Sequence, residues 1–177
     1  MVLPDPSGSY PKPYFTATGC GRCYTRLAIV PRFFTLLEAE QLLPEVERLL
    51  NALKDQKALY EQAESELTNI SHRIALTGGM VPPRERLAQL HASKDASARS
   101  LKAMVEKIQA LGCQLKDLEM GLVDFPTLYR EEEVYLCWKA GESGIGYWHH
   151  VEDGYQGRRP IDSDFLAHHR GEGGGES

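Results

Sequence analysis

The fold is decided by residues 35–77, which read TLLEAEQLLPEVERLLNALKDQKALYEQAESELTNISHRIALT. Thr35 and Glu38 match a capping box, in which two side chains bond the free backbone amides at the start of a helix. Gly78-Gly79 follows Thr77 and ends the helical pattern, so the sequence predicts one helix over 35–77. Pro44 could kink this helix. The apolar residues are spaced three and four apart, as in a coiled coil, and only Gln56 interrupts the series. They are Ala39, Leu42, Val46, Leu49, Leu53, Tyr60, Ala63, Leu67, Ile70 and Ile74.

A second helix is predicted over 84–111, where Pro82-Pro83 precedes it and Gly112 supplies the C-cap. The first helix carries eight acidic and four basic residues, whereas the second carries three acidic and six basic ones. Opposite net charges favour pairing of the two helices as an antiparallel hairpin. The matching apolar seam of the second helix consists of Leu87, Leu90, Leu101, Met104, Ile108 and Leu111.

The N-terminal half of the first helix has a second apolar stripe, formed by Leu36, Leu43 and Leu50. At a rise of 1.5 Å per residue, the helices span about 60 Å and about 40 Å, so the first overhangs the second. We place this overhang at the doubly apolar end, where the chain after Gly112 would fold back upon it. There the period changes to two, which predicts short strands over 114–119, 133–139 and 145–151.

The predicted fold class is therefore α+β: a long, coiled-coil-like antiparallel two-helix hairpin with a small C-terminal antiparallel β-meander packed on its base. Residues 1–32, rich in Pro, Gly and Thr, are expected to form a poorly ordered extension. Residues 33–111 form the hairpin, and 112–161 form the β module of the same domain. The end of the chain is glycine-rich and polar, so 162–177 are expected to be a disordered tail.

Composition excludes several classes of protein. Of 177 residues, 42% are hydrophobic, and no apolar run approaches the length of about 20 that crosses a bilayer. The N-terminus lacks the features of a signal peptide, and four cysteines are too few for a disulfide scaffold, so a cytoplasmic location is expected. A net charge of −5 argues against nucleic acid as a partner, because duplex binding depends on cationic side chains.

Four segments carry a family resemblance: RFFTLLEAEQLLPEV (32–46), GCQLKDLEMGLVDFP (112–126), VYLCWKAGESGIGYWHH (134–150) and GYQGRRPI (154–161). Together they resemble the bacterial proteins of the domain-of-unknown-function family 2203, over roughly 33–161. The family has no assigned activity, so the resemblance implies none. His150 and Arg159 depart from its usual pattern. Matched by position, its recurring polar and aromatic residues are Asp124, Cys137, Trp138, Glu142, Trp148, His149 and Arg158.

A metal site is one hypothesis for this module, with Cys137, His149 and Asp124 as candidate ligands and zinc or iron as the ion. Cysteine, histidine and carboxylate bind zinc, and three protein ligands leave a position for water. No HExxH motif or paired CxxC supports this reading, and the one CxxC, at Cys20 and Cys23, has no second pair. The alternative is that Cys137 is a small buried hydrophobe and the histidines are surface or core residues.

Strand register separates these readings. If residues 141–144, GESG, form a four-residue loop, Trp138 pairs with Tyr147, and Cys137 and His149 lie on opposite faces of the sheet. A loop one residue longer or shorter would put Cys137 opposite His149, because a single slip reverses every side chain. The sequence leaves both registers open.

A broader candidate ligand site consists of Asp124, Glu142, Trp148, His149 and Arg158. With Arg158 and Arg159 as bidentate donors, it could bind a carboxylate or phosphate. The alternative is that these arginines pair with local acids such as Glu152 and Asp153. No motif identifies a reaction or a catalytic residue.

Two functions therefore stay open. The first is a non-catalytic interaction or scaffold protein, whose helical hairpin binds a protein partner or a second copy of the chain. The second is a small-ligand or metal-binding module, which could include a hydrolase-like enzyme. The length and periodicity of the helices favour the first.

Overall fold

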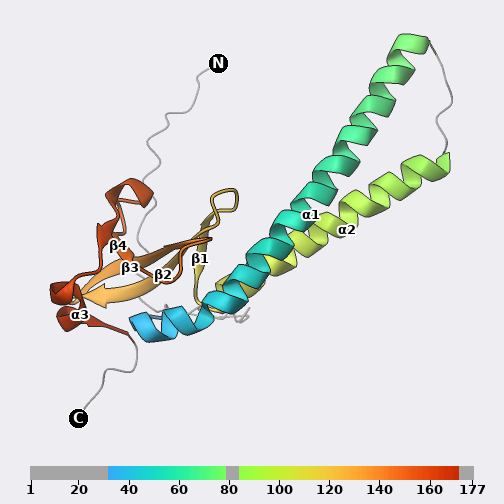
Figure 1. The fold of residues 1–177 in the computed structure, drawn as a ribbon. Helices are drawn as coiled ribbons and strands as arrows, with labels where there is room; N and C mark the ends of the chain where they lie inside the picture. Colours follow the sequence, from blue (N-terminus) through green and yellow to red (C-terminus); the bar gives the residue numbers. More distant parts are fainter. Residues whose placement is uncertain (1–31, 79–83, 172–177) are drawn as a thin grey trace, which may run out of the picture. The chain divides into compact units, whose positions relative to one another are not determined.

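The structure, a computed structural model, describes residues 32–78 and 84–171; the predicted extension therefore lies outside the described residues, apart from Arg32. Helix α1 spans Leu36–Thr77 and helix α2 spans Arg84–Ala110, each within one residue of its predicted bounds. The two helices pack together as the predicted hairpin (Figure 1). No described helix combines the length and apolar character needed to cross a membrane.

Local interactions set both ends of α1. The Thr35 hydroxyl accepts from the backbone N–H of Glu38 at 3.2 Å, and the Glu38 carboxylate accepts from the Thr35 N–H at 2.8 Å. This is the predicted capping box. After Thr77, Gly78 takes a left-handed conformation with φ +67°, which costs glycine little. Pro44 lies within the continuous helix.

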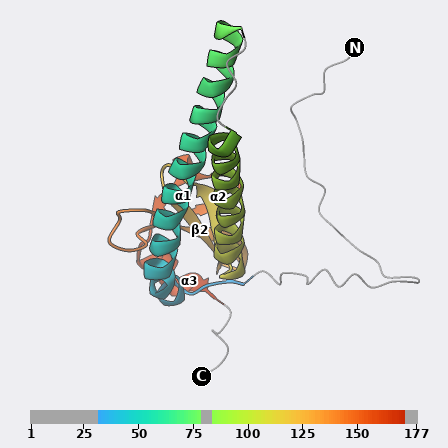
Figure 2. The same ribbon diagram turned by 90° about the vertical axis from the view of Figure 1, so that its right-hand side faces the viewer.

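The charges of the two helices meet as the sequence predicts. Lys94 of α2 contacts Glu64 of α1 at 2.9 Å, and Arg86 contacts Glu66. Since Arg86 lies in the first turn of α2, the last turns of α1 extend beyond α2, as Figure 2 shows. The sequence predicted that α1 overhangs α2 only at the N-terminal end of α1, where the sheet packs. That prediction was therefore incomplete.

The helical base and the sheet share one hydrophobic core, which confirms the role of the second apolar stripe. Leu50 is fully buried, and Leu36 and Leu43 pack against the core from its margin. The core joins residues of both helices to residues of the sheet. Its central members are Val46, Leu49, Leu50, Leu53, Ile108, Val123, Phe125, Val134, Leu136 and Trp138.

Six antiparallel strands form the sheet. They are β1 (Gln114–Asp117), β2 (Leu122–Tyr129), β3 (Glu132–Lys139), β4 (Tyr147–His150), β5 (Arg159–Pro160) and β6 (His169–Arg170). The order is β1-β2-β3-β4-β5, and β6 pairs with the end of β2 that β1 leaves free. A short 3₁₀-helix, η1 (Tyr155–Gly157), precedes β5.

The sequence missed β2, the strand that pairs with three others. Its residues 122–127 are all buried, so the strand lacks the alternation of apolar and polar residues that identifies a half-buried strand. Pro126 is also atypical of a central strand, because proline cannot donate to a ladder. Residues 114–117, 133–139 and 147–150 of the predicted strands do form strands.

The disordered tail predicted over 162–177 is wrong for its first ten residues. Helix α3 (Ser163–His168) is capped by Asp162, whose carboxylate accepts from the backbone N–H of Phe165 at 2.8 Å. Phe165 is fully buried and stacks on Tyr129 and Trp148. The glycine-rich end dominated the composition of this segment, but Phe165, the pairing of β6 with β2 and the bond from Leu36 to His169 dock its first part. Residues 172–177 lie outside the described part of the chain.

Candidate metal centre

Three neighbouring strands bring Asp124, Cys137 and His149 together on one face of the sheet. Asp124 on β2 is the direct cross-strand partner of Cys137 on β3. Side chains alternate between faces along a strand, and their neighbours Val123 and Trp138 point into the core shared with the helices. The three residues therefore occupy the face opposite the helical hairpin.

The register between β3 and β4 decides whether His149 joins the other two. The structure pairs Cys137 with Tyr147 and Tyr135 with His149, one residue away from the register that a four-residue loop gives. Cys137 and His149 consequently share a face as diagonal neighbours, not as the directly opposed pair that the alternative register suggested. Of the two readings that the sequence left open, the structure has the one that assembles the cluster.

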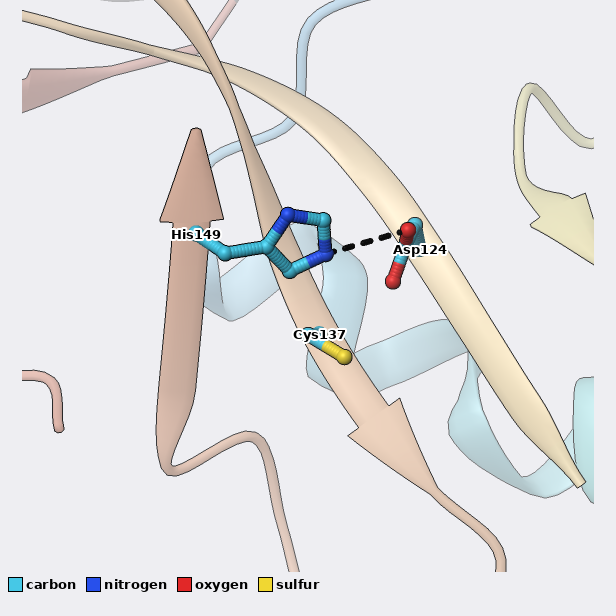
Figure 3. Close-up of side chains that lie close together, drawn as sticks. All are labelled: Asp124, Cys137 and His149. Atoms are coloured by element: carbon cyan, nitrogen blue, oxygen red, sulfur yellow. Dashed lines mark hydrogen bonds and ion pairs between the residues drawn. The ribbon is translucent and has the colours of Figure 1, made fainter. Parts of the chain in front are cut away.

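The three side chains are almost completely buried, with exposures of 1% for Asp124, 0% for Cys137 and 1% for His149. One ligand atom from each lies within 4.8 Å of the other two (Figure 3). Sulfur, imidazole nitrogen and carboxylate oxygen at such separations are a donor set that suits zinc. In the described part of the chain, no other group of three potential ligands meets this geometry.

The ring of His149 is held from both sides. Its Nδ1 donates to the backbone carbonyl of His150 at 2.8 Å, and its Nε2 lies 3.2 Å from Oδ2 of Asp124. Burial lowers the pKa of His149, but its bonds to Asp124 and to the His150 carbonyl outweigh burial and raise the pKa above its ordinary value. A metal-binding histidine characteristically donates its other ring N–H to a carbonyl or carboxylate, as His149 does.

The second carboxylate oxygen of Asp124 has no partner. Oδ2 faces His149, whereas Oδ1 is buried and accepts no hydrogen bond from a nitrogen or oxygen donor among the described residues, which leaves the thiol of Cys137 as its neighbour. In Figure 3 this oxygen lies on the side of the Cys137 sulfur. A buried carboxylate oxygen without a donor is costly, and coordination of a cation is one way to satisfy it.

The thiol of Cys137 is not suited to nucleophilic catalysis without a metal. Burial, and after it the negative charge of Asp124, raises the pKa of Cys137 to about 12. Reactive cysteines have lowered pKa values and partial exposure, which is the opposite environment. A bound cation would stabilise the thiolate directly, since a coordinating thiol loses its proton.

The broader ligand site that the sequence predicted is not assembled. Arg158 donates to both carboxylate oxygens of Glu142, at 2.7 and 2.9 Å, and to the backbone carbonyl of Cys137 at 3.2 Å. The two side chains thus pair with each other and brace the strand behind Cys137, while Nε of Arg158 is buried without a partner. Trp148 and His149 are adjacent in β4, so their side chains point to opposite faces of the sheet. His149 faces the cluster, and Trp148 packs against Phe165 on the other face.

The role expected of Arg159 is simpler. Its guanidinium lies 3.6 Å from the Asp153 carboxylate in an exposed pair, which agrees with the reading that it pairs with a local acid. Arg158 instead pairs with the more distant Glu142, inside the loop between β3 and β4. An exposed pair of this kind contributes little to stability.

Sequence reasoning missed Lys116. Its Nζ lies 3.8 Å from Oδ2 of Asp124 and 4.8 Å from the centre of the Tyr135 ring. The signal that could have found it is the pairing of β1 with β2, which sets Gln114 opposite Asp124. That pairing was out of reach because β2 itself was not predicted.

The fold and the site define an α+β protein in which a helical hairpin supports a small sheet, and the sheet holds a buried Asp–Cys–His cluster. The chain belongs to the family described as "Uncharacterized conserved protein (DUF2203)", which matches residues 32–161. This confirms the family resemblance and includes all three cluster residues. No curated protein and no solved structure matches the chain.

Proposed function

We propose that this protein binds a zinc ion through Asp124, Cys137 and His149. The observation that carries the proposal is the convergence of three buried ligand atoms within 4.8 Å of one another. The bond from His149 Nδ1 to the His150 carbonyl leaves Nε2 as the ligand nitrogen. The unpartnered Oδ1 of Asp124 supports the same reading.

Charge and ligand type favour zinc over the harder cations. A thiolate and a carboxylate neutralise a divalent ion in a buried site, and imidazole completes a donor set typical of zinc. Three protein ligands are the number found in catalytic zinc sites, where the ion lowers the pKa of bound water and supplies a nucleophile for hydrolysis. Iron remains an alternative outcome of the measurement.

Elemental analysis of the untagged chain, purified without added metal or chelator, tests the proposal. We expect about one zinc ion per chain in the wild type and its loss in Cys137→Ala and His149→Ala. Cys113→Ala is the matched control, because Cys113 is an equally buried thiol outside the cluster. It should retain the metal.

A second control addresses the CxxC pair. Cys20→Ser with Cys23→Ser should also keep the metal, because the proposed ligands lie in the sheet. Zinc that disappears in this double variant and persists in His149→Ala would contradict the proposal. Absence of any metal from the wild type, even after incubation with zinc, would contradict it equally.

The helical hairpin supports a second candidate function, a scaffold that binds a protein partner or a second copy. The last turns of α1 extend beyond α2, and the side chains of Leu59 and Leu76 on α1 are exposed. Light scattering at several concentrations should then show self-association that Leu76→Glu weakens. A monomer mass at every concentration would contradict self-association. For location we propose the cytoplasm, where free thiols such as Cys113 persist.

A further inference from the structure

Lys116 reaches the candidate metal centre from solvent, beside Gln114, which pairs directly with Asp124. Residues Gln114 and Leu115 pair with Asp124 and Val123, but Asp117 pairs with Leu122, so Lys116 is an extra residue in the ladder. Such β-bulges redirect a side chain. The Lys116 side chain is 38% exposed, yet its ammonium lies 3.8 Å from the buried carboxylate of Asp124.

The surroundings of the ammonium hold it at this position. The Gln114 side-chain carbonyl accepts a hydrogen bond from Lys116 Nζ at 3.0 Å, and the Tyr135 ring lies beneath the ammonium at 4.8 Å. Lys116 is the only described lysine with an ammonium within 4 Å of a cluster carboxylate. The ammonium of Lys116 and Nε2 of His149 therefore both lie near Oδ2 of Asp124.

We infer that Lys116 and the metal ion compete for Asp124, so that metal binding displaces Lys116 and uncovers the cluster. This rests on the proposed function. Without metal, the ammonium offsets the negative charge of Asp124. With a divalent ion on the cluster, the carboxylate and the thiolate are already neutralised, so the attraction that holds the ammonium is lost. Its flexible stem and partial exposure let Lys116 move into water without disturbing the sheet.

The competition predicts the direction of a charge-removing substitution. Lys116→Met keeps an unbranched side chain over Tyr135 and removes the ammonium, so the dissociation constant for zinc should fall about fivefold. Even with the dielectric constant of water, the attraction between two unit charges about 4 Å apart, which metal binding must overcome in the wild type, is worth about that factor. Lys116→Arg retains the charge and should bind zinc with nearly the wild-type affinity.

The experiment is a competition titration of zinc against a chromophoric chelator, with circular dichroism to check that each variant is folded. Lys139→Met is the matched control, since Lys139 lies on β3 two residues from Cys137 and its substitution removes the same charge. Its affinity should change much less. Equal affinities for Lys116→Met and the wild type, or equal gains in both methionine variants, would overturn the inference while leaving the zinc site intact. A wild type that binds no zinc would overturn both proposals.

Chemical labelling gives a second readout that requires no substitution. Acetylation of the wild-type chain by an N-hydroxysuccinimide ester, followed by peptide mapping, reports the exposure of each lysine. Zinc should increase the labelling rate of Lys116 several-fold and leave that of Lys102, an exposed lysine of α2, unchanged. An unchanged rate at Lys116 in the zinc-loaded protein would show that the ammonium stays in place and would overturn the displacement.

Discussion

Asp124 and Cys137 face each other directly across β2 and β3, and both side chains are buried on the side of the sheet away from the helices. A carboxylate and a thiol in this position contribute no apolar packing to the core that holds the hairpin and sheet together. The pair fits the proposed metal site, because a buried carboxylate must be compensated by specific partners.

The pairing of Asp124 with His149 predicts a large effect on the metal-free protein. Asp124→Ala removes the partner of the His149 Nε2, so the free energy of unfolding should fall by about 3 kcal/mol or more. Asp124→Asn keeps a hydrogen-bonding oxygen and should lower the free energy of unfolding by less. Urea denaturation in the presence of a chelator measures both. An Asp124→Ala variant as stable as the wild type would show that the pair contributes nothing.

The two described cysteines should be unreactive in the native, metal-free protein. Both are buried, and burial raises the pKa of the Cys113 and Cys137 thiols to about 12. In a chain with Cys20 and Cys23 replaced by serine, a thiol-specific disulfide reagent at pH 8 should react slowly until denaturant is added. Rapid modification of either thiol in the native state would mean that the sheet opens easily around it.

His169 predicts a loss of stability in acid. Its Nε2 accepts the backbone N–H of Leu36 at 2.9 Å, which requires a neutral ring at the start of α1. Burial lowers the pKa of His169 below its ordinary value of 6.5, and the backbone of Leu166 opposes this only in part. Below about pH 6.5, the unfolded chain therefore takes up a proton that the folded chain resists, so stability falls as pH falls.

The difference between the wild type and His169→Gln isolates this effect. The stability advantage of the wild type, measured by urea denaturation, should be constant above about pH 6.5 and shrink as the pH is lowered through the folded pKa. His168→Gln, at an exposed histidine of α3, is the control. Its stability should exceed that of His169→Gln by the same margin as the stability of the wild type does. A difference that is independent of pH would refute the neutral contact.

Phe165 predicts that the C-terminal segment is part of the stable fold. Phe165→Ala removes a fully buried ring from between Tyr129, Trp148 and His169 and should cost about 3 to 5 kcal/mol. Leu166→Ala is the matched control on the same short helix, because Leu166 is 51% exposed, and it should cost less than about 0.5 kcal/mol. Thermal unfolding of the two variants provides the comparison.

The helical part of the fold was predictable because its signals are local. Thr35 and Glu38 announce the start of α1, Gly78 ends it, and the apolar spacing between them needs no partner to be recognised. The predicted and observed bounds of both helices agree within one residue. The opposite charges of the helices likewise predicted their pairing, which Lys94 and Glu64 realise.

The site was predictable only as a set of residue types. Cys137, His149 and Asp124 were candidates from the sequence, but Glu142, Arg158 and Trp148 were equally so, and the structure places these three in other roles. Lys116 could not be found, since its relation to Asp124 depends on the pairing of β1 with β2, which the sequence did not reveal. Strands buried on both faces lose the alternation by which they are recognised.

The sequence by itself determined two capped helices, the hairpin they form, the α+β class and the family. Only the tertiary structure decided that β2 is central, that Phe165 docks the C-terminal segment, and that Cys137 and His149 share a face. The reason is physical. Helix signals arise between residues three and four positions apart, whereas strand register is set by loops and by packing between distant segments. A shift of one residue between β3 and β4 would have placed Cys137 and His149 on opposite faces, and the same sequence would then form no cluster.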